Sequence, residues 1–267
     1  MDIGLIVALL LMGAFGGFAA GLLGIGGGMV LVPFITMIFT ARGFNPELTI
    51  HMAIATSLAT ILFTSVSSVR AHHKHGAVLW PVVKLLTPGI VIGSWIGPWI
   101  GKQMNSAFLA AFFGVFVAFS ATQMLIGKKP AAARALPGTP GMFAAGGFIG
   151  TLSGIVGAGG GFISVPFMTW CGVRIHNAVA TSAALGFPIA LSGTISNIYF
   201  GWGEAGLPEH SLGFIYLPAL AVIVLASVMM APLGARTAHK MPVRQLQKVF
   251  AVILYALAAY MFWKAFH

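Results

Sequence analysis

The chain has 267 residues, of which 58% are hydrophobic and only 7% are charged. Soluble domains are about 45–50% apolar and about 25% charged, so this composition excludes a soluble globular protein and a disordered chain. The 14 Lys and Arg against 4 Asp and Glu give a net charge of +10. Most of these cations stand in short loops between apolar runs, as the positive-inside bias requires. The sequence predicts an integral membrane protein with lipid around it and no nucleic-acid partner.

The N-terminus carries Asp2, no basic region and no small-residue cleavage site after its apolar run. A cleaved signal peptide has both features, so we expect the first membrane segment to begin at Met1. The single cysteine, Cys171, excludes a disulfide within the chain and a cysteine metal cluster. We expect no metal and no other cofactor.

Eight apolar runs follow one another, and each is near or above the roughly 20 residues that a membrane helix needs. They cover residues 3–40, 49–69, 77–100, 106–126, 142–173, 177–200, 212–235 and 246–266. The polar, basic segment 127–141 separates the fourth run from the fifth and is rich in Pro and Gly. It divides the chain into an N-terminal membrane repeat (1–126), a cytoplasmic linker (127–141) and a C-terminal membrane repeat (142–267).

The two halves repeat each other in sequence. At an offset of 133, ten of the 21 residues in 14–34 are identical to those in 147–167, including both glycine triplets and both Pro-Phe pairs. At an offset of 125, HMAIATS (51–57) matches HNAVATS (176–182) at five of seven positions. The same motifs occur twice in the same order, and duplicated halves are typical of transporter folds.

The first run of each half is unusual. Residues 3–40 would form a helix of about 57 Å at 1.5 Å per residue, which is too long for a single crossing. A glycine triplet interrupts each of these two runs, and each glycine costs about 1 kcal/mol relative to alanine in a helix. We therefore predict that 3–40 and 142–173 are broken helical hairpins whose ends return to the side from which they started.

The charges favour this hairpin topology. With eight single crossings, six cations lie on one side and seven on the other, which gives no orientation. With two hairpins, ten cations share one side, whereas the opposite side keeps three cations and all four acids. We predict that the ten-cation side is cytoplasmic, that both termini are outside, and that the halves form inverted repeats in an all-α membrane protein.

The glycine triplets are the leading candidates for a substrate site: Gly26, Gly27, Gly28, Gly159, Gly160 and Gly161. A helix that restarts after a break has unpaired N–H groups and a partial positive charge at its first turn. Two such breaks meeting near the middle of the membrane would bind an anion. Close helix packing is the alternative, and it is the favoured interpretation for the spaced Gly17, Gly21, Gly146, Gly150 and Gly154.

Two hydroxyl pairs stand early in the helices that follow the breaks: Thr56-Ser57 and Thr181-Ser182. They could donate hydrogen bonds to an oxyanion, or they could bond the backbone carbonyl four residues back. Asn197, late in the sixth run, is a weaker candidate.

His51 and His176 stand at matching positions at the start of the same helices. A structural hydrogen bond is the favoured role, and proton coupling is the alternative, because no Asp or Glu occurs between Glu47 and Glu204. Arg70 is a candidate for attracting anions or for marking the membrane interface. The cluster His72-His73-Lys74-His75 lacks a nearby acid, and we predict a solvated cytoplasmic loop there.

With these motifs in place, the chain resembles the TauE/SafE family of membrane permeases, also called the toluene-sulfonate uptake permease family. The resemblance rests on the repeated glycine-rich motif that ends in GGG-x4-PF, on the two A-T-S helices and on the basic linker. It implies transport of sulfite, sulfonates or related organic or inorganic sulfur anions across the bacterial inner membrane. Whether protons accompany the anion, and the oligomeric state, stay open.

We therefore expect a secondary transporter that works by alternating access around the two glycine triplets. An anion channel built from the same broken helices is the alternative, and sequence does not separate the two. An intramembrane hydrolase is disfavoured, because Thr151 replaces the glycine of a Gly-x-Ser-Gly motif and no acid could orient a histidine. We expect no enzymatic activity.

Overall fold

The computed structural model describes residues 3–23, 27–126, 135–240 and 243–266. It is helical apart from one short β-hairpin, β1 (Ser211–Leu212) and β2 (Ile215–Tyr216), whose two strands pair antiparallel. The helices are α1 (Ile3–Leu23), α2 (Gly28–Ala41), α3 (Pro46–Lys74), α4 (Trp80–Gln103), α5 (Ser106–Ile126), α6 (Thr139–Val156), α7 (Gly161–Trp170), α8 (Ile175–Gly201), α9 (Leu217–Lys240) and α10 (Val243–Phe266).

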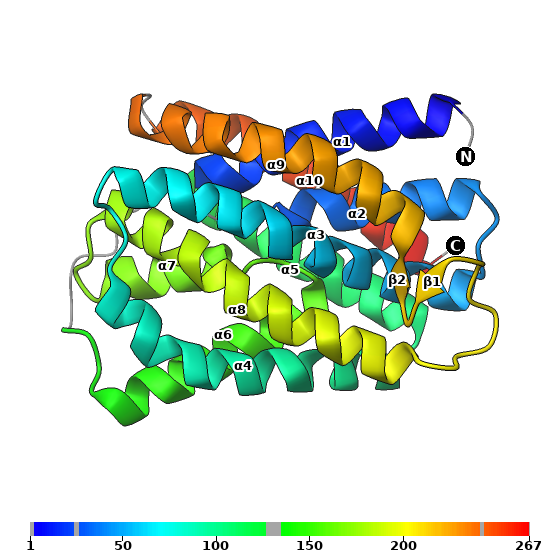
Figure 1. Ribbon diagram of the computed structural model, residues 1–267, viewed down its shortest axis with the longest axis horizontal. Coiled ribbons are helices and arrows are strands. Elements are labelled where there is room, and N and C mark those ends of the chain that lie inside the picture. Colours follow the sequence, from blue (N-terminus) through cyan, green and yellow to red (C-terminus); the bar gives the residue numbers. More distant parts are fainter. Residues whose placement is uncertain (1–2, 24–26, 127–134, 241–242, 267) are drawn as a thin grey trace.

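Eight of the described helices are long and apolar enough to cross a membrane, and α2 and α7 are shorter. The predicted all-α membrane protein is confirmed at this level. The helices run along one common axis, and both chain termini lie at the same end of the molecule (Figure 1). In that view α1 and α9 form one edge, α4 and α6 form the opposite edge, and α3 and α8 lie between them.

The central helices α3 and α8 form the core of the molecule. In each of them 72% of the most apolar window is buried, against 28–44% in the other six spans. α3 begins where Pro46 supplies the first helical residue and the Asn45 side chain accepts a hydrogen bond from the Glu47 N–H at 3.0 Å. The two A-T-S motifs lie on these helices, so they are surrounded by protein rather than lipid.

Spaced glycines allow α1 to pack directly on the backbone of α9. A Cβ added to Gly13 would lie 3.0 Å from the Ile223 Cα, and one added to Gly17 would lie 2.7 Å from the carbonyl carbon of Ser227. Gly21 meets Ala231 in the same way. These glycines recur every four residues and therefore share one helix face, which is the small-residue packing used between membrane helices.

The contact between α4 and α6 is built in the same way. A Cβ on Gly150 would lie 2.9 Å from the Ser94 nitrogen, and one on Gly154 would lie 3.1 Å from the Gly97 Cα. Gly146 packs on the backbone at Leu86 and Ile90. The packing role predicted for the spaced glycines in both halves is confirmed. Since α1 and α4 belong to the first half and α6 and α9 to the second, each half packs its outer helix against the other half.

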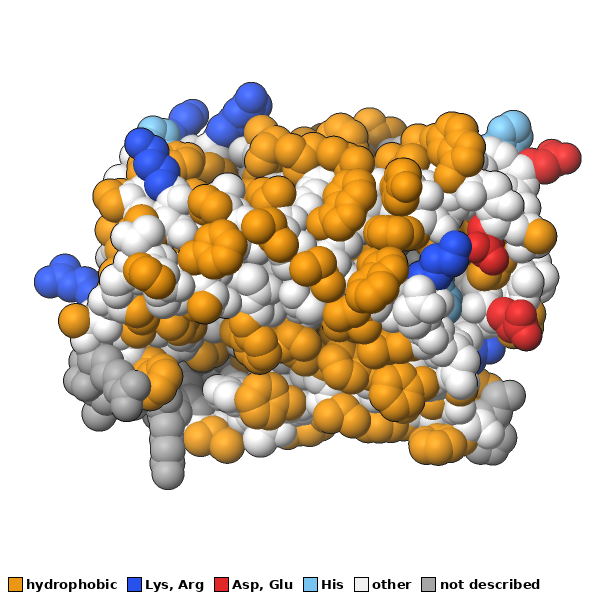
Figure 2. Space-filling view, turned by 90° about the horizontal axis from the view of Figure 1, so that it is seen from below, with side chains coloured by type: hydrophobic (Ala, Val, Ile, Leu, Met, Phe, Trp, Pro, Cys, Tyr) orange, Lys and Arg blue, Asp and Glu red, His pale blue; other side chains and the backbone are white. Residues whose placement is uncertain are grey.

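The outer surface suits a lipid environment. Leu11, Leu225, Met229 and Val252 point outward and are 65–75% exposed, and lipid tails are as apolar as these side chains. Figure 2 shows hydrophobic side chains over the length of the molecule, with Lys and Arg gathered mainly at one end and the described Glu side chains at the other. We name these the basic end, which holds Lys74 and Arg174, and the acidic end, which holds Glu47, Glu204 and Glu209.

The prediction of a solvated loop at His72–His75 is wrong for His72, whereas His73, Lys74 and His75 are exposed. α3 continues through Lys74, and His72 is 1% exposed with its Nε2 3.1 Å from the Gly21 carbonyl oxygen on α1. His73 lies beside Trp80, whose indole N–H is 3.3 Å from the His73 Nδ1. The hydrophilic composition of the segment does not predict that one side of this last helical turn packs against α1.

Candidate functional site

Each glycine triplet interrupts a helix. α1 ends at Leu23 and α2 begins at Gly28, whereas α6 ends at Val156 and α7 begins at Gly161. The residue before each new helix, Gly27 or Gly160, has a φ of 73° or 77°. Glycine adopts this left-handed conformation without a steric penalty. Gly26, which we also assigned to the site, lies outside the described residues.

The two breaks have equivalent surroundings in the two halves. A Cβ on Gly27 would meet the Gly16 carbonyl and the Ala20 side chain at 3.3 Å. A Cβ on Gly160 would meet Ile149 at 3.1 Å and the Ser153 Oγ at 3.0 Å. Both glycines therefore meet the residues eleven and seven positions earlier in the chain, so each new helix starts alongside the helix that precedes it.

The breaks of the two halves are in contact. A Cβ added to Gly28 would lie 2.7 Å from the Ala158 Cα and closer still to the carbonyl oxygen of Gly157. Gly157 itself has a φ of 68° and packs against Ile54 of α3, whose Cα would lie 2.9 Å from a Cβ added to Gly157. The start of α2 thus lies directly on the interrupted backbone between α6 and α7.

The helices that restart here provide backbone donors. The first intrahelical bonds of α2 run from Val30 and Leu31 to the Gly27 carbonyl, and those of α7 run from Ile163 and Ser164 to the Gly160 carbonyl. The N–H groups of the two preceding residues come before the first helical hydrogen bond, and the helix dipole adds partial positive charge. Such helix starts favour an anion.

The serines of the A-T-S motifs both face the breaks. The Ser57 hydroxyl donates to the Gly157 carbonyl at 2.9 Å, although the two residues are 100 positions apart in the chain. The Ser182 hydroxyl accepts a hydrogen bond from the Ser164 hydroxyl of α7 at 2.8 Å. Both A-T-S serines are completely buried. Ser57 therefore connects α3 to the backbone of the second break, and Ser182 connects α8 to the first turn of α7.

The two threonines accept hydrogen bonds from the segments that precede two other helices. The Thr56 Oγ1 accepts from the Tyr216 N–H at 3.1 Å, and the Thr181 Oγ1 accepts from the Leu79 N–H at 3.0 Å. Tyr216 immediately precedes α9, and Leu79 immediately precedes α4. Each threonine thus anchors the start of a helix from the opposite half, a role that neither sequence interpretation anticipated.

The secondary candidates lie in different surroundings. His51 is half-buried at the acidic end, with its Nδ1 3.2 Å from the Glu47 carbonyl oxygen and its Nε2 3.1 Å from that of Gly101, which suits the structural role. His176 and Arg70 are exposed. Asn197 is buried and donates to the Gly193 carbonyl at 2.8 Å. The structure does not bring these four residues together with the breaks.

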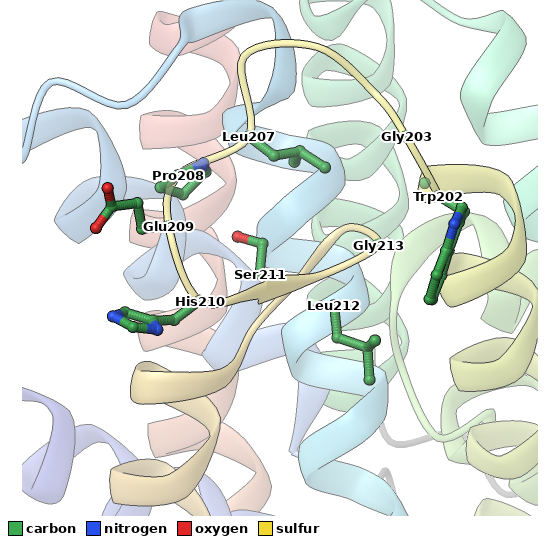
Figure 3. Close-up of a pocket in the computed structure, with 10 residues that line it drawn as sticks. Trp202, Gly203, Leu207, Pro208, Glu209, His210, Ser211, Leu212 and Gly213 are labelled. Atoms are coloured by element: carbon green, nitrogen blue, oxygen red, sulfur yellow. The ribbon is translucent and has the colours of Figure 1, made fainter.

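A surface cavity of about 350 Å³ lies at the acidic end rather than at the breaks (Figure 3). It is lined by residues of the segment 201–213, including Trp202, His210 and Ser211. The β-hairpin that carries Ser211 continues inward, where Phe214 and Ile215 are 3% and 2% exposed and pack on α3 beside Thr56. The cavity therefore lies on the segment between α8 and α9, apart from the two breaks.

Comparison with known proteins agrees with this architecture. The family described as "Sulfite exporter TauE/SafE" matches residues 9–261. A "Probable membrane transporter protein" of Haemophilus influenzae is 39% identical over 97% of this chain and 98% of its own length. Similar proteins are the probable membrane transporters MJ0441 of Methanocaldococcus jannaschii, 25% identical over 96% of this chain and 95% of its own, and YunE of Bacillus subtilis, 27% identical over 93% and 94%.

No solved structure matches this chain significantly. The family match spans nearly the whole membrane region, including both glycine breaks and both A-T-S motifs. It agrees with the resemblance that the repeated motifs carry. The chain belongs to the TauE/SafE sulfite exporter family.

Proposed function

We propose that this membrane transporter is a secondary carrier that moves a small sulfur-containing anion across the inner membrane by alternating access. The observation that carries the proposal is the contact between the two helix breaks, Gly28 on Gly157 and Ala158, beside the buried helix α3. The family description supports sulfite or a related anion as the substrate. The anion would bind where α2 and α7 restart.

The chemistry of the interior supports an anion over a cation. Helix starts present N–H groups, and the nearby Ser57 hydroxyl is already paired with the Gly157 carbonyl, which removes one acceptor that would repel an anion. No Asp or Glu occurs between Glu47 and Glu204, so the interior helices of this region lack the carboxylates that coordinate cations or relay protons.

Two covering segments support alternating access. On the acidic side the β-hairpin inserts Phe214 and Ile215 against α3 and is anchored at Thr56. On the basic side the segment before α4 buries Ala77 and Val78, and its Leu79 N–H is anchored at Thr181. Opening one segment at a time would expose the breaks to one side of the membrane at a time.

Loss of the hydrogen bond between the Tyr216 N–H and Thr56 should loosen the β-hairpin on the acidic side and leave the segment before α4 unchanged. Thr56→Val keeps the side-chain shape but removes the acceptor for the Tyr216 N–H, and one such hydrogen bond contributes about 1 kcal/mol. The open population should then rise roughly fivefold. The measurement is the maleimide-labelling rate of a cysteine placed at Ala59, under the hairpin, in a Cys171→Ser background.

The matched control is Thr181→Val, which removes the equivalent anchor on the basic side. It should leave labelling at Ala59 unchanged. Equal acceleration by both variants would mean that the threonines stabilise the fold in general and do not hold separate covers.

The course of the two interrupted helix pairs supports inverted halves and the same mechanism. α1 begins and α2 ends at the acidic end, whereas α6 begins and α7 ends at the basic end (Figure 1). We expect cysteines at Gly43 and Thr139 to react with an impermeant reagent from opposite sides of the membrane, with Gly43 outside. Labelling of both positions from one side would contradict this topology.

Proteoliposomes test the function directly. Vesicles that contain the purified protein should take up radiolabelled sulfite. Unlabelled sulfite inside the vesicles should accelerate that uptake, because a carrier reorients its binding site across the membrane faster when the site is loaded. Flux without such acceleration would assign the protein to the alternative, an anion channel. Absence of flux for sulfite, thiosulfate and a simple sulfonate would overturn the proposal.

A further inference from the structure

One buried hydroxyl at the second break lacks a hydrogen-bond partner. Ser153 of α6 is 0% exposed, and its Oγ has no partner among the described residues. The great majority of buried side-chain polar atoms in proteins have at least one partner. An unpaired hydroxyl in this place therefore requires an explanation.

The position of this hydroxyl supplies one. The Ser153 Oγ lies 3.0 Å from the place that a Cβ on Gly160 would occupy, and Gly160 is the residue immediately before α7. The N–H groups of Gly161 and Phe162 precede the first hydrogen bonds of that ten-residue helix. A hydroxyl donor and a helix N-terminus thus lie at the same break.

The first half has no counterpart to this hydroxyl. At the offset of 133, Ser153 corresponds to Ala20 and Ser164 corresponds to Leu31. Ala20 approaches Gly27 with its methyl group, and Leu31 packs on Gly16. The two breaks therefore share their backbone geometry but differ in chemistry, since the second presents hydroxyls where the first presents hydrocarbon.

We propose that the Ser153 hydroxyl donates a hydrogen bond to the transported anion at the start of α7. This inference rests on the proposed function. It assigns the hydrogen bonds to the anion's oxygen atoms to the second half of the chain. The ligand class is a small oxyanion, which accepts from the Ser153 O–H and from the first N–H groups of α7. The first break closes against this site through Gly28 and presents the Ala20 methyl.

The binding role and a structural role predict different results for Ser153→Ala. If Ser153 binds the anion, removing it loses a hydrogen bond to a charged group, and sulfite affinity should fall about tenfold or more. Because the hydroxyl is unpaired without ligand, the thermal midpoint of the ligand-free protein should stay the same or rise. Sulfite titration of purified protein by calorimetry, together with thermal unfolding, measures both quantities.

Two further variants control the experiment. Ser192→Ala removes a hydroxyl that is already bonded to the Val91 carbonyl at 2.6 Å, so it should lower the thermal midpoint and leave sulfite affinity unchanged. The double variant Ser153→Ala with Ala20→Ser moves the hydroxyl to the first break and should stay weak. Recovery of wild-type affinity by that double variant would overturn the assignment to the second half.

The failure of this inference is distinguishable from the failure of the proposed function. Wild-type protein that binds and transports sulfite, together with Ser153→Ala that binds it equally well, would overturn only the role of Ser153. Wild-type protein that neither binds nor transports any of the tested sulfur anions would overturn the proposed function and this inference with it.

Discussion

Gly28→Ala should reduce the proposed sulfite transport about 100-fold or more while the protein still inserts and folds. The added Cβ would lie 2.7 Å from the Ala158 Cα and closer to the Gly157 carbonyl oxygen, and both neighbours are backbone. The breaks would have to separate by about 1 Å, and a misplacement of that size in a binding site costs about 100-fold. Uptake into proteoliposomes at equal protein density measures the effect.

The backbone conformation of Gly28 makes this substitution informative. Gly28 is not among the described glycines with positive φ, whereas Gly27 is. Alanine at position 28 therefore introduces no backbone strain, and its effect comes from the contact between the halves alone.

Gly147→Ala is the matched control within a helix. Its added Cβ would meet only the Gly89 carbonyl oxygen, at 3.9 Å, which is an ordinary contact distance. Transport by this variant should stay within about twofold of wild type, since neither break moves. Size-exclusion elution verifies that both variants are folded. A folded Gly28→Ala protein with wild-type transport would show that the contact between the breaks is not needed.

The course of the helices could be predicted because it depends on local composition. Apolar runs of about 20 residues specify crossings regardless of what they pack against. Consecutive glycines end a helix locally, so the restarts at Gly28 and Gly161 fall within the triplets. Spaced glycines predict close packing for the same local reason, because they place a bare backbone on one helix face.

The partners of the site residues could not be predicted, because they are distant in sequence. Ser57 bonds a carbonyl 100 residues away, and Thr56 bonds an N–H 160 residues away. The candidate binding residues were predicted from positions that are identical in the two halves. Ser153 is not such a position, because its equivalent in the first half is Ala20. The two breaks differ in this side chain, which is a hydroxyl beside Gly160 and a methyl group beside Gly27. Only the three-dimensional neighbours of Gly160 show that the difference lies at the proposed site.

His72 illustrates a tertiary contact that overrides local composition. Three histidines and a lysine in a row are typical of a solvated loop, but α3 extends to Lys74 and turns His72 toward the Gly21 carbonyl. Gly21 lies in the last turn of α1, where backbone carbonyls lack an intrahelical donor and can accept from other groups. The glycine that permits packing against α9 thus also accommodates a polar side chain from α3.

The second large effect is expected at the interface between α4 and α6, where Gly93→Ala should destabilise the folded protein by about 1–3 kcal/mol. A Cβ there would lie 2.8 Å from the Thr151 nitrogen and closer to the Gly147 carbonyl oxygen, and overpacking of a close contact costs about this much. Because the neighbours are backbone atoms of α6, they cannot rotate away, and the helices must separate. Thermal or denaturant unfolding in detergent measures the loss.

Gly101→Ala is the control in the same helix and on the same four-residue spacing. A Cβ at Gly101 would have no heavy atom within 4 Å beyond its own helical turns, and Gly101 is not at a positive φ. Both substitutions replace glycine by alanine in a helix, which favours alanine by about 1 kcal/mol. Gly101→Ala should therefore be neutral or stabilising, and the difference between the variants isolates helix packing. Equal stability of the two proteins would mean that α4 and α6 are not held together by backbone contact at Gly93.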